Sequence, residues 1–426
     1  MVDRRPQDFP DGEPDGITDN TLAIQAALDA WQPGDQVVIS GGTFRTSSQL
    51  LIAQDGLLLT GDGTIRARST FPVNSALLEI TGTGVTLDTD GLTLDQADVM
   101  MNGDSICALG AVGLQLRNLV SRGTQRSFLC IEADTTDLVL ADCDHFGKGY
   151  GVLALDPPGV TRLTLRGSTF EHFGSGSQGD GVQLNCHTHG ASFVDVIGCA
   201  ARNYIGEANS KGIGFGFAGV TDGRITGCRV SQCEGDAFHL ENGAHRWLCA
   251  DLVAGDIGVP NPVGGNGSGL IAYDSDDITV VLMLARNCGY HGIALSGQGS
   301  LAQRLNGVIE RCTVDTTGRD GIHLTAQKDF RIDRNWVRDP SNGNPGLYAG
   351  IHVARQGGTT LENIDGTGVG NAIVLSGATT PLGEIVVRPE SVNVVIDGLG
   401  GAEIRVTEEG DTRVTEAGEL RALEIG

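Results

Sequence analysis

The chain of 426 residues has few aromatic residues, few basic residues and no long apolar segment. The longest apolar run, ITVVLMLA at 278–285, is too short to span a bilayer. The opening MVDRRPQDFPDG lacks the apolar segment of a signal peptide, so Sec-type secretion is not expected. Lys and Arg number 29 against 53 Asp and Glu, which gives a net charge of −24. This charge repels phosphate backbones and anionic lipids, so we expect neither nucleic acid nor a membrane as a partner.

Glycine, by contrast, is abundant, at 64 residues, which is about twice its average usage. This composition is typical of a β-protein rich in turns, and the 40% hydrophobic content is too high for a disordered chain. The ten cysteines are scattered along the chain, and several occupy one phase of a repeat. We therefore expect buried free thiols in a protein that folds in a reducing cytosol.

Residues 11–31, DGEPDGITDNTLAIQAALDAW, contain the one segment with a helical pattern. Ile24, Leu28 and Trp31 recur at i, i+4 and i+7, and Thr18, Asp19 or Asn20 could cap the helix. Because one side of this helix is strongly apolar, we expect it to cover the end of the β-structure that follows.

From about residue 130 the chain repeats a short strand of the form Gly-apolar-x-apolar, with successive copies beginning 22 to 32 residues apart. The copies are GVLAL (151–155), GVQLN (181–185), GIGFG (212–216), AFHLE (237–241), GLIAY (269–273), GIALS (292–296), GIHLT (321–325), GIHVA (350–354) and AIVLS (372–376). Such a period indicates a solenoid. Small residues at a second repeated phase should stack as a buried ladder: Cys143, Ser168, Cys199, Cys228, Cys312 and Asn335.

The segments DGITDNTLAIQAALDA and ISGGTFRT resemble the N-terminal cap and first coil of the pectate-lyase-like β-helix superfamily. The resemblance implies an all-β fold, a right-handed, single-stranded parallel β-helix with a capping helix and a short β-repeat tail. We place the N-terminal segment and helix at 1–35, the β-helix at 36–398 and the tail at 399–426. The superfamily includes lyases, hydrolases, epimerases and viral tailspikes, so the fold leaves the chemistry open.

The tail consists of three octads, EIRVTEEG, DTRVTEAG and ELRALEIG, at 403–410, 411–418 and 419–426. Apolar residues alternate with arginine, and so short a strand needs partners, of which identical tails are the simplest; a disordered acidic end is the alternative. The octads resemble short tails of phage and gene-transfer-agent fibre and spike proteins. This resemblance implies a homotrimer that contacts other virion proteins and is assembled in the host cytoplasm.

In each repeated strand the middle residue should point outward. Aligning the strands by sequence places Gly214 in line with His239, and Gly216 in line with Glu241, which predicts a notch at the two glycines. The outward columns form a polar strip suited to sugar hydroxyls. We expect the glycan contacts to be Gln183, Asn185, His187, His239, Glu241 and Tyr273.

The same strip offers candidates for catalysis: Asp180, Asp236, Glu241 and His239. Two carboxyl groups at suitable separation could hydrolyse a glycoside, whereas an Asp before Gly commonly only caps a turn. Lyase or epimerase chemistry could instead use Arg246, His187 and His239, although the chain lacks the aromatic-Gly-Phe-Asp-Pro-His-Glu segment of the bacterial alginate epimerases.

We expect no metal and no cofactor. His323 and His352 should lie on neighbouring coils and stack, because a histidine pair alone lacks further metal ligands. The sequence as a whole predicts a virion spike that binds bacterial surface polysaccharide. The alternatives are a polysaccharide-degrading enzyme, either glycoside hydrolase or lyase, and a structural linker without a ligand.

Overall fold

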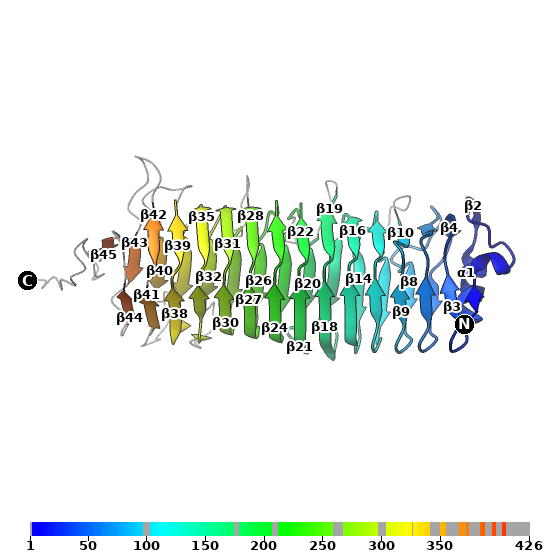
Figure 1. The fold of residues 1–426 in the computed structure, drawn as a ribbon, viewed down its shortest axis with the longest axis horizontal. Coiled ribbons are helices and arrows are strands. Elements are labelled where there is room, and N and C mark those ends of the chain that lie inside the picture. The colour runs from blue at the N-terminus through cyan, green and yellow to red at the C-terminus, as the bar shows by residue number, and fades with distance from the viewer. Residues whose placement is uncertain are drawn as a thin grey trace, which may run out of the picture. The chain divides into compact units, whose positions relative to one another are not determined.

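The computed structural model describes residues 2–96, 103–173, 179–206, 212–258, 267–296, 304–325, 327–340, 350–354, 366–369, 371–374, 384–387, 394–397 and 403–405. The chain forms two compact units, residues 1–212 and 213–426, each of which is described by itself. Both units are parallel β-solenoids with three strands in each coil, and the strands of successive coils lie side by side (Figure 1).

The first unit has three parallel sheets, here named A1, B1 and C1, with strands given in their spatial order. Sheet A1 contains β1 (Asp3–Arg4), β3 (Gln36–Val38), β6 (Leu58–Thr60), β9 (Thr86–Asp88), β12 (Gln115–Arg117), β15 (Thr136–Ala141), β18 (Val160–Arg166) and β21 (Ala191–Ile197). Sheet B1 contains β2 (Asp15–Asp19), β4 (Thr43–Thr46), β7 (Thr64–Ala67), β10 (Thr93–Asp95), β13 (Val120–Arg122), β16 (Asp144–Gly147), β19 (Thr169–His172) and β22 (Ala200–Arg202). Sheet C1 contains β5 (Leu50–Ile52), β8 (Leu78–Ile80), β11 (Ile106–Leu109), β14 (Ser127–Glu132), β17 (Tyr150–Leu155) and β20 (Val182–Asn185).

The second unit has the corresponding sheets A2, B2 and C2. Sheet A2 contains β24 (Val220–Thr226), β27 (His245–Ala250), β30 (Asp276–Val281), β34 (Val308–Glu310), β38 (Phe330–Asp333), β41 (Gly366–Val369) and β44 (Val394–Asp397). Sheet B2 contains β25 (Arg229–Ser231), β28 (Val253–Ile257), β31 (Leu284–Cys288), β35 (Thr313–Thr317), β39 (Trp336–Arg338) and β42 (Ala372–Val374). Sheet C2 contains β23 (Phe215–Ala218), β26 (Phe238–Glu241), β29 (Leu270–Tyr273), β32 (Ile293–Ser296), β36 (Ile322–Thr325), β40 (Ile351–Ala354), β43 (Glu384–Val387) and β45 (Glu403–Arg405). A short pair, β33 (Arg304–Leu305) and β37 (Gln327–Lys328), lies outside these sheets.

The alternation of side chains along each strand explains the solenoid. In β18, Leu163 and Leu165 are buried, and each lies beside a buried valine of β21, Val194 and Val196. One face of each strand therefore fills the interior, and identical spacing in the next coil continues the same core.

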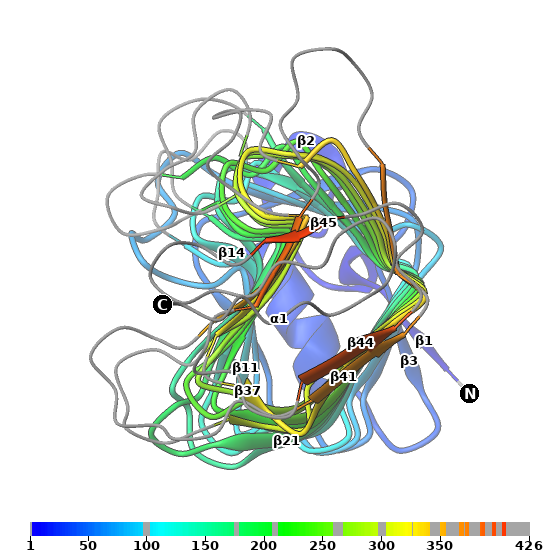
Figure 2. The same ribbon diagram turned by 90° about the vertical axis from the view of Figure 1, so that its left-hand side faces the viewer.

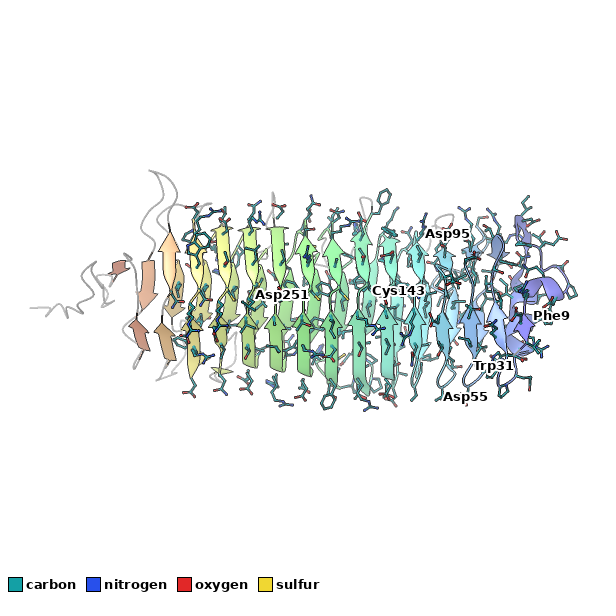
Figure 3. The ribbon with its side chains drawn as sticks, in the orientation of Figure 1. Phe9, Trp31, Asp55, Asp95, Cys143 and Asp251 are labelled. Atoms are coloured by element: carbon teal, nitrogen blue, oxygen red, sulfur yellow. The ribbon has the colours of Figure 1, made fainter. Side chains whose placement is uncertain are left out.

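Residues in the left-handed conformation, several of them Asp or Asn, turn the chain from the A strands to the B strands. Asp142 has φ 55° before the buried Cys143, and Asp251 has φ 54° before the buried Leu252. Cys143 and Asp251 are labelled in Figure 3. Asp and Asn tolerate this conformation better than other non-glycine residues, so the turn is encoded locally.

The predicted ladder of small residues is confirmed in part, because the buried Leu252 and Met283 occupy its positions between Cys228 and Cys312. In the first unit the Cys143 amide donates to Ser168 Oγ at 3.2 Å, and in the second the Cys312 amide donates to Asn335 Oδ1 at 2.9 Å. Asn371 continues the second ladder, because its Oδ1 accepts the Asn335 amide at 3.0 Å. All ten cysteines are buried and free, as the sequence predicted. Buried backbone groups at the turns are thereby satisfied by stacked side chains.

The predicted helix is also present, as α1 (Thr21–Asp29), preceded by the 3₁₀ helix η1 (Pro6–Asp8). Ile24 and Leu28 are fully buried, and α1 packs against η1 and β5. Viewed along the coils, α1 lies within the outline of the strands of its unit (Figure 2). Asn20 occupies the N-cap position, and the preceding Asp19 accepts the Thr21 amide at 3.1 Å.

Two further predictions concern the ends of the sequence and membranes. The first three octad residues, Glu403–Arg405, form β45, which pairs in parallel with β43. The remaining octad residues, 406–426, lie outside the described residues. Within the described parts of the chain, no helix combines the length and the apolar character needed to cross a membrane.

Candidate functional site

Sheets C1 and C2 repeat one pairing of positions: a buried corner residue and, three residues later, a side chain on the outer face of the strand. The corner holds Asp180 before Gln183, Asp236 before His239 and Asp320 before His323. These aspartates are between 0% and 2% exposed. The Gly-apolar-x-apolar repeat creates this pairing, because the strand register carries both positions from coil to coil.

The observed register corrects the predicted alignment around the two glycines. Phe215 lies beside Phe238, so Gly216 lies beside His239 and Ala218 lies beside Glu241. The sequence alignment was wrong by two residues. It took Gly212 and Ile213 as the start of the repeated strand, whereas the observed register starts it at Gly214 and Phe215. Gly214 therefore matches Ala237, one residue after the corner, and Gly216 alone lies in the outward column of His239, so the predicted pair of outward glycines is not present.

Asp236, His239 and Glu241 form a connected chain in the second unit. His239 Nδ1 lies 2.8 Å from Asp236 Oδ2, with which it forms a hydrogen bond, and Asp236 Oδ1 accepts the backbone amides of Gly267 at 3.0 Å and Ser268 at 2.8 Å. His239 Nε2 lies 3.3 Å from Glu241 Oε2, an ion pair without hydrogen-bond geometry. These contacts connect the buried Asp236 and His239 to Glu241, whose side chain is 37% exposed.

This arrangement favours an ionised pair. Burial alone would lower the pKa of His239, but Asp236 and Glu241 outweigh it and raise the pKa to about 9. Burial likewise opposes ionisation of Asp236, yet His239 and the two backbone amides hold the pKa of Asp236 below its usual value. At neutral pH the structure therefore contains a buried imidazolium between two carboxylates.

Next to Asp236, His239 and Glu241, polar side chains continue along one row of sheet C2. Leu240 pairs with Ala272, which places Glu241 and Tyr273 on neighbouring strands, and Tyr273 pairs with Ser296 and then Thr325. The Ser296 and Thr325 hydroxyls lie 2.6 Å apart. The Tyr273 ring lies 5.7 Å from the His239 ring. All four residues of the row are partly exposed, and the row spans roughly 14 Å at the usual strand spacing.

The first unit holds the other predicted residues. Gln183 and Asn185 are partly exposed on β20, beside Leu153 and Leu155, and His187 Nδ1 contacts Asn185 Oδ1 at 2.5 Å. Leu153 is 2% exposed and Leu155 is 58% exposed. The polar patch of the first unit is therefore smaller than the row of sheet C2, and it borders leucine.

Accessibility limits the chemistry that the predicted catalytic residues could perform. Asp236 is fully buried and accepts three hydrogen bonds, so it orients His239 rather than reaching a substrate. His239 is only 2% exposed. The predicted lyase arrangement does not assemble around it, because Arg246 lies on β27 of sheet A2 and its guanidinium makes two hydrogen bonds to Asp222, at 2.6 and 2.7 Å.

A second cluster surrounds the predicted pair His323 and His352, whose rings lie 5.0 Å apart in an edge-to-face contact. The expectation that this pair lacks further ligands is wrong, because His291 and Asp320 lie against it. Burial raises the pKa of Asp320, but the hydrogen bonds from His323 and His352 outweigh burial and lower it. Burial also lowers the pKa of His291, to about 3. His291 was missed because the sequence alignment followed only outward residues. The sequence feature that could have identified His291 is its position directly before GIALS, which matches the position of Asp320 directly before GIHLT.

Comparison with known proteins agrees with this architecture. The model of the right-handed β-helix region matches residues 159–365. The catalytic unit of an α-1,3-glucanase from Streptomyces thermodiastaticus is similar at 13% identity, covering 93% of this chain and 68% of that chain, with a TM-score of 0.54. The Dettilon tailspike protein is similar at 14% identity (94% and 67% covered, TM-score 0.49), and so is a surface adhesin of Streptococcus pneumoniae at 13% identity (99% and 99% covered, TM-score 0.42).

No curated protein sequence matches the chain. The family-model match covers just under half of the chain, and together with the parallel coils it supports the fold of a right-handed parallel β-helix. At identities this low the likeness shows the fold, and the function has to be argued from the side chains.

Proposed function

We propose that the protein binds bacterial surface polysaccharide through the polar row of sheet C2, as the spike or fibre of a phage-like particle. The single observation that carries the proposal is the Glu241 carboxylate, which sits at the surface beside Tyr273 and is paired with a buried, charged His239. A carboxylate accepts hydrogen bonds from sugar hydroxyls, and an aromatic ring packs against the apolar face of a sugar ring.

The buried ion pair behind Glu241 supports binding because it fixes the acceptor before the ligand arrives. Pre-organised groups lose less conformational entropy on binding. Ser296 and Thr325 extend the row with hydroxyl groups that both donate and accept, which suits a chain of several sugars. Gln183, Asn185 and His187 in the first unit provide a second set of polar groups for the same ligand class.

The proposed virion role rests on the octads at 403–426, whose pattern resembles fibre and spike tails. In this proposal three chains associate through the octads, α1 acts as the N-terminal cap, and residues 1–35, 36–398 and 399–426 are the cap, the β-helix and the tail. Three copies on one particle would strengthen attachment by avidity. The homotrimer is tested by solution mass with and without residues 403–426, and the proposed contacts with other virion proteins and the assembly in a host cytoplasm are tested by looking for the protein in purified particles.

Binding is tested with purified protein and a panel of bacterial capsular polysaccharides and lipopolysaccharides. Wild-type protein should retain at least one of them, and Glu241→Ala and Tyr273→Ala should lose it. Glu132→Ala is the matched control, because Glu132 occupies the same strand position in sheet C1 and its side chain is 48% exposed. Retention that is equal in all variants would contradict the proposed site.

A polysaccharide-degrading enzyme is the second candidate, and the raised pKa of His239 favours it because catalytic acids often have perturbed pKa values. In that case Glu241 and His239 would exchange protons with the substrate, and Asp236 would hold the imidazole. The 2% exposure of His239 favours binding over cleavage. Release of shorter oligosaccharides by the wild type, abolished in Asp236→Asn, would decide for the enzyme.

A further inference from the structure

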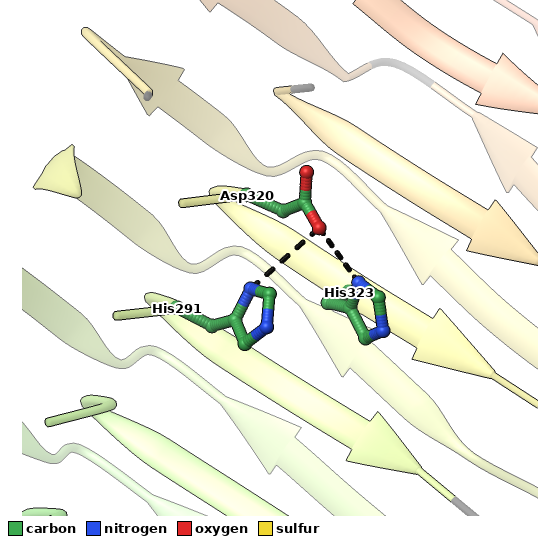
Figure 4. Close-up of side chains that lie close together, drawn as sticks. All are labelled: His291, Asp320 and His323. Carbon is green, nitrogen blue, oxygen red and sulfur yellow. Dashed lines mark hydrogen bonds and ion pairs between the residues drawn. The ribbon is translucent and has the colours of Figure 1, made fainter. Parts of the chain in front are cut away.

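Three histidine side chains converge on one carboxylate oxygen in the second unit. Asp320 Oδ2 lies 2.7 Å from His323 Nδ1, 3.2 Å from His352 Nδ1 and 3.6 Å from His291 Nδ1. Figure 4 shows the Nδ1 sides of His291 and His323 directed at the Asp320 carboxylate. The repeat assembles the cluster, because Ile293, Ile322 and Ile351 pair in register and each coil thus adds one or two members.

The cluster contains a nitrogen atom without a hydrogen bond. His291 Nδ1 is buried and has no hydrogen-bond partner, and the His291 side chain is 6% exposed. Its distance of 3.6 Å from Asp320 Oδ2 is too long for a hydrogen bond. An unsatisfied buried polar atom is costly, so this nitrogen atom calls for a partner that the protein itself does not supply.

The surroundings hold His291 in this orientation. The Tyr290 ring meets the His291 ring edge-on at 4.4 Å, and the Arg319 guanidinium lies 4.0 Å from the centre of the Tyr290 ring. The His323 ring also stacks on His291 at 4.4 Å. Two ring contacts therefore hold the imidazole, with Nδ1 directed at the carboxylate.

We propose that His291, Asp320 and His323 bind a divalent transition-metal ion of the Zn²⁺ type, with His352 as an adjacent fourth ligand. The donor atoms of His291, Asp320 and His323 lie within 4.8 Å of one another. Ligands of a tetrahedral Zn²⁺ ion, at about 2.0–2.2 Å from the metal, lie roughly 3.4 Å apart, so small side-chain rotations would complete the site. Imidazole and carboxylate donors suit this class of ion, and this proposal is independent of the polysaccharide-binding proposal.

The Asp236 cluster provides an internal comparison. The register places Ile213 and Ile271 around Asp236 where His291 and His352 surround Asp320. Asp236 and His239 therefore lack the additional imidazoles, and the proposal assigns the metal ion to the Asp320 cluster alone.

The test is a titration of untagged full-length protein, stripped with a chelator, with Zn²⁺ alone in a calorimeter. Wild-type protein should bind one Zn²⁺ ion per chain, and Asp320→Asn, His291→Gln and His323→Gln should each weaken binding by more than about tenfold. His245→Gln is the control, because His245 pairs with Asp276 at 3.4 Å without further histidines in contact among the described residues, and it should leave binding unchanged. Circular dichroism establishes that each variant is folded.

X-ray absorption of the zinc-loaded wild-type protein needs no variant and gives a second, independent readout. The proposal predicts nitrogen and oxygen neighbours with the multiple-scattering pattern of imidazole. It is overturned if no stoichiometric binding occurs, if the spectrum shows sulfur or only water oxygen, or if both histidine variants bind as the wild type does. In these cases the cluster is a hydrogen-bonded ion-pair network only.

Discussion

Sheets C1 and C2 have the same coil geometry but different side chains at matching positions. Asp104 in the first unit occupies the corner position that Asp236 occupies in the second, two residues before the buried Ile106 and Phe238. The Asp104 carboxylate lies 2.7 Å from the Arg126 guanidinium and also bonds Ser127. Asp236, by contrast, bonds His239.

The difference shows how one backbone pattern supports two kinds of buried charge. Burial raises the pKa of Asp104 in spite of Arg126, and Arg126 itself stays charged at any physiological pH. In sheet C2 the partner is a histidine, which titrates and can ligate metals. Because the outward residue that follows Asp104 is Cys107, whereas His239 follows Asp236, the Asp236 carboxylate bonds an imidazole and the Asp104 carboxylate pairs with an arginine.

The largest expected difference between the sheets is in stability. Asp236→Ala leaves a fully buried imidazole without its main partner, and we expect a loss of about 3–5 kcal/mol. Asp104→Ala leaves Arg126, whose side chain is 30% exposed and can turn to water, so we expect about 1–3 kcal/mol. Urea denaturation measures the free energy of unfolding of both variants. Equal losses in the two variants would contradict the expected difference between Asp236 and Asp104.

The second largest expected difference between the sheets is in the pH dependence of folding stability. The folded-state pKa of His239, about 9, exceeds its ordinary value of 6.5, so its stabilisation is complete below about 6.5 and is lost as the pH rises through 9. The Asp236 pKa is lowered, so its contribution is lost only in acid, and the raised pKa of Tyr273 keeps that group neutral. Between pH 6.5 and 8.5 the wild type should lose roughly 2 kcal/mol more stability than a variant without His239.

His239→Gln serves as the control for this measurement, because it lacks only the titration of His239 and keeps the other titrating groups. The ten buried thiols, several of which have a pKa raised by burial, ionise in the unfolded chain at about pH 8.5, so they lower the stability of wild type and variant alike and cancel in the difference between the two. An equal alkaline loss in wild type and variant would show that His239 is not the titrating group.

Ligand binding offers a smaller contrast between the polar row and the patch on β20. Loss of a hydrogen bond to the charged Glu241 should weaken polysaccharide binding by about tenfold or more, whereas Asn185→Ala should weaken it by only about two- to tenfold. Asn185 lies beside the exposed Leu155 and already contacts His187. Equilibrium binding to one retained polysaccharide ranks the two variants, and the opposite order would move the main site to the first unit.

The smallest expected contrast concerns the thiols. All ten cysteines are buried in both units, so native protein should react very slowly with an Ellman-type reagent, and denatured protein should release ten equivalents. Rapid native reaction of several thiols would mean that the ladders in one unit are open.

Sequence reasoning predicted the parts of this structure that depend on local pattern. The parallel coils, helix α1 and the burial of Cys143 follow from alternation, capping and repeated small residues. The register at Gly214 was missed, because two Gly-apolar steps fit the same period and only packing against Phe238 selects one. His291 was missed because its role depends on Asp320 in the next coil, which alignment of outward residues does not reveal.

The most direct test of the central claim is hydrogen exchange of the full chain with and without a polysaccharide that it retains. If the polar row of sheet C2 is the binding surface, the ligand should slow exchange in peptides covering β26 and β29, and leave β14 unchanged. Slower exchange confined to the first unit, or no change at saturating ligand, would contradict this account.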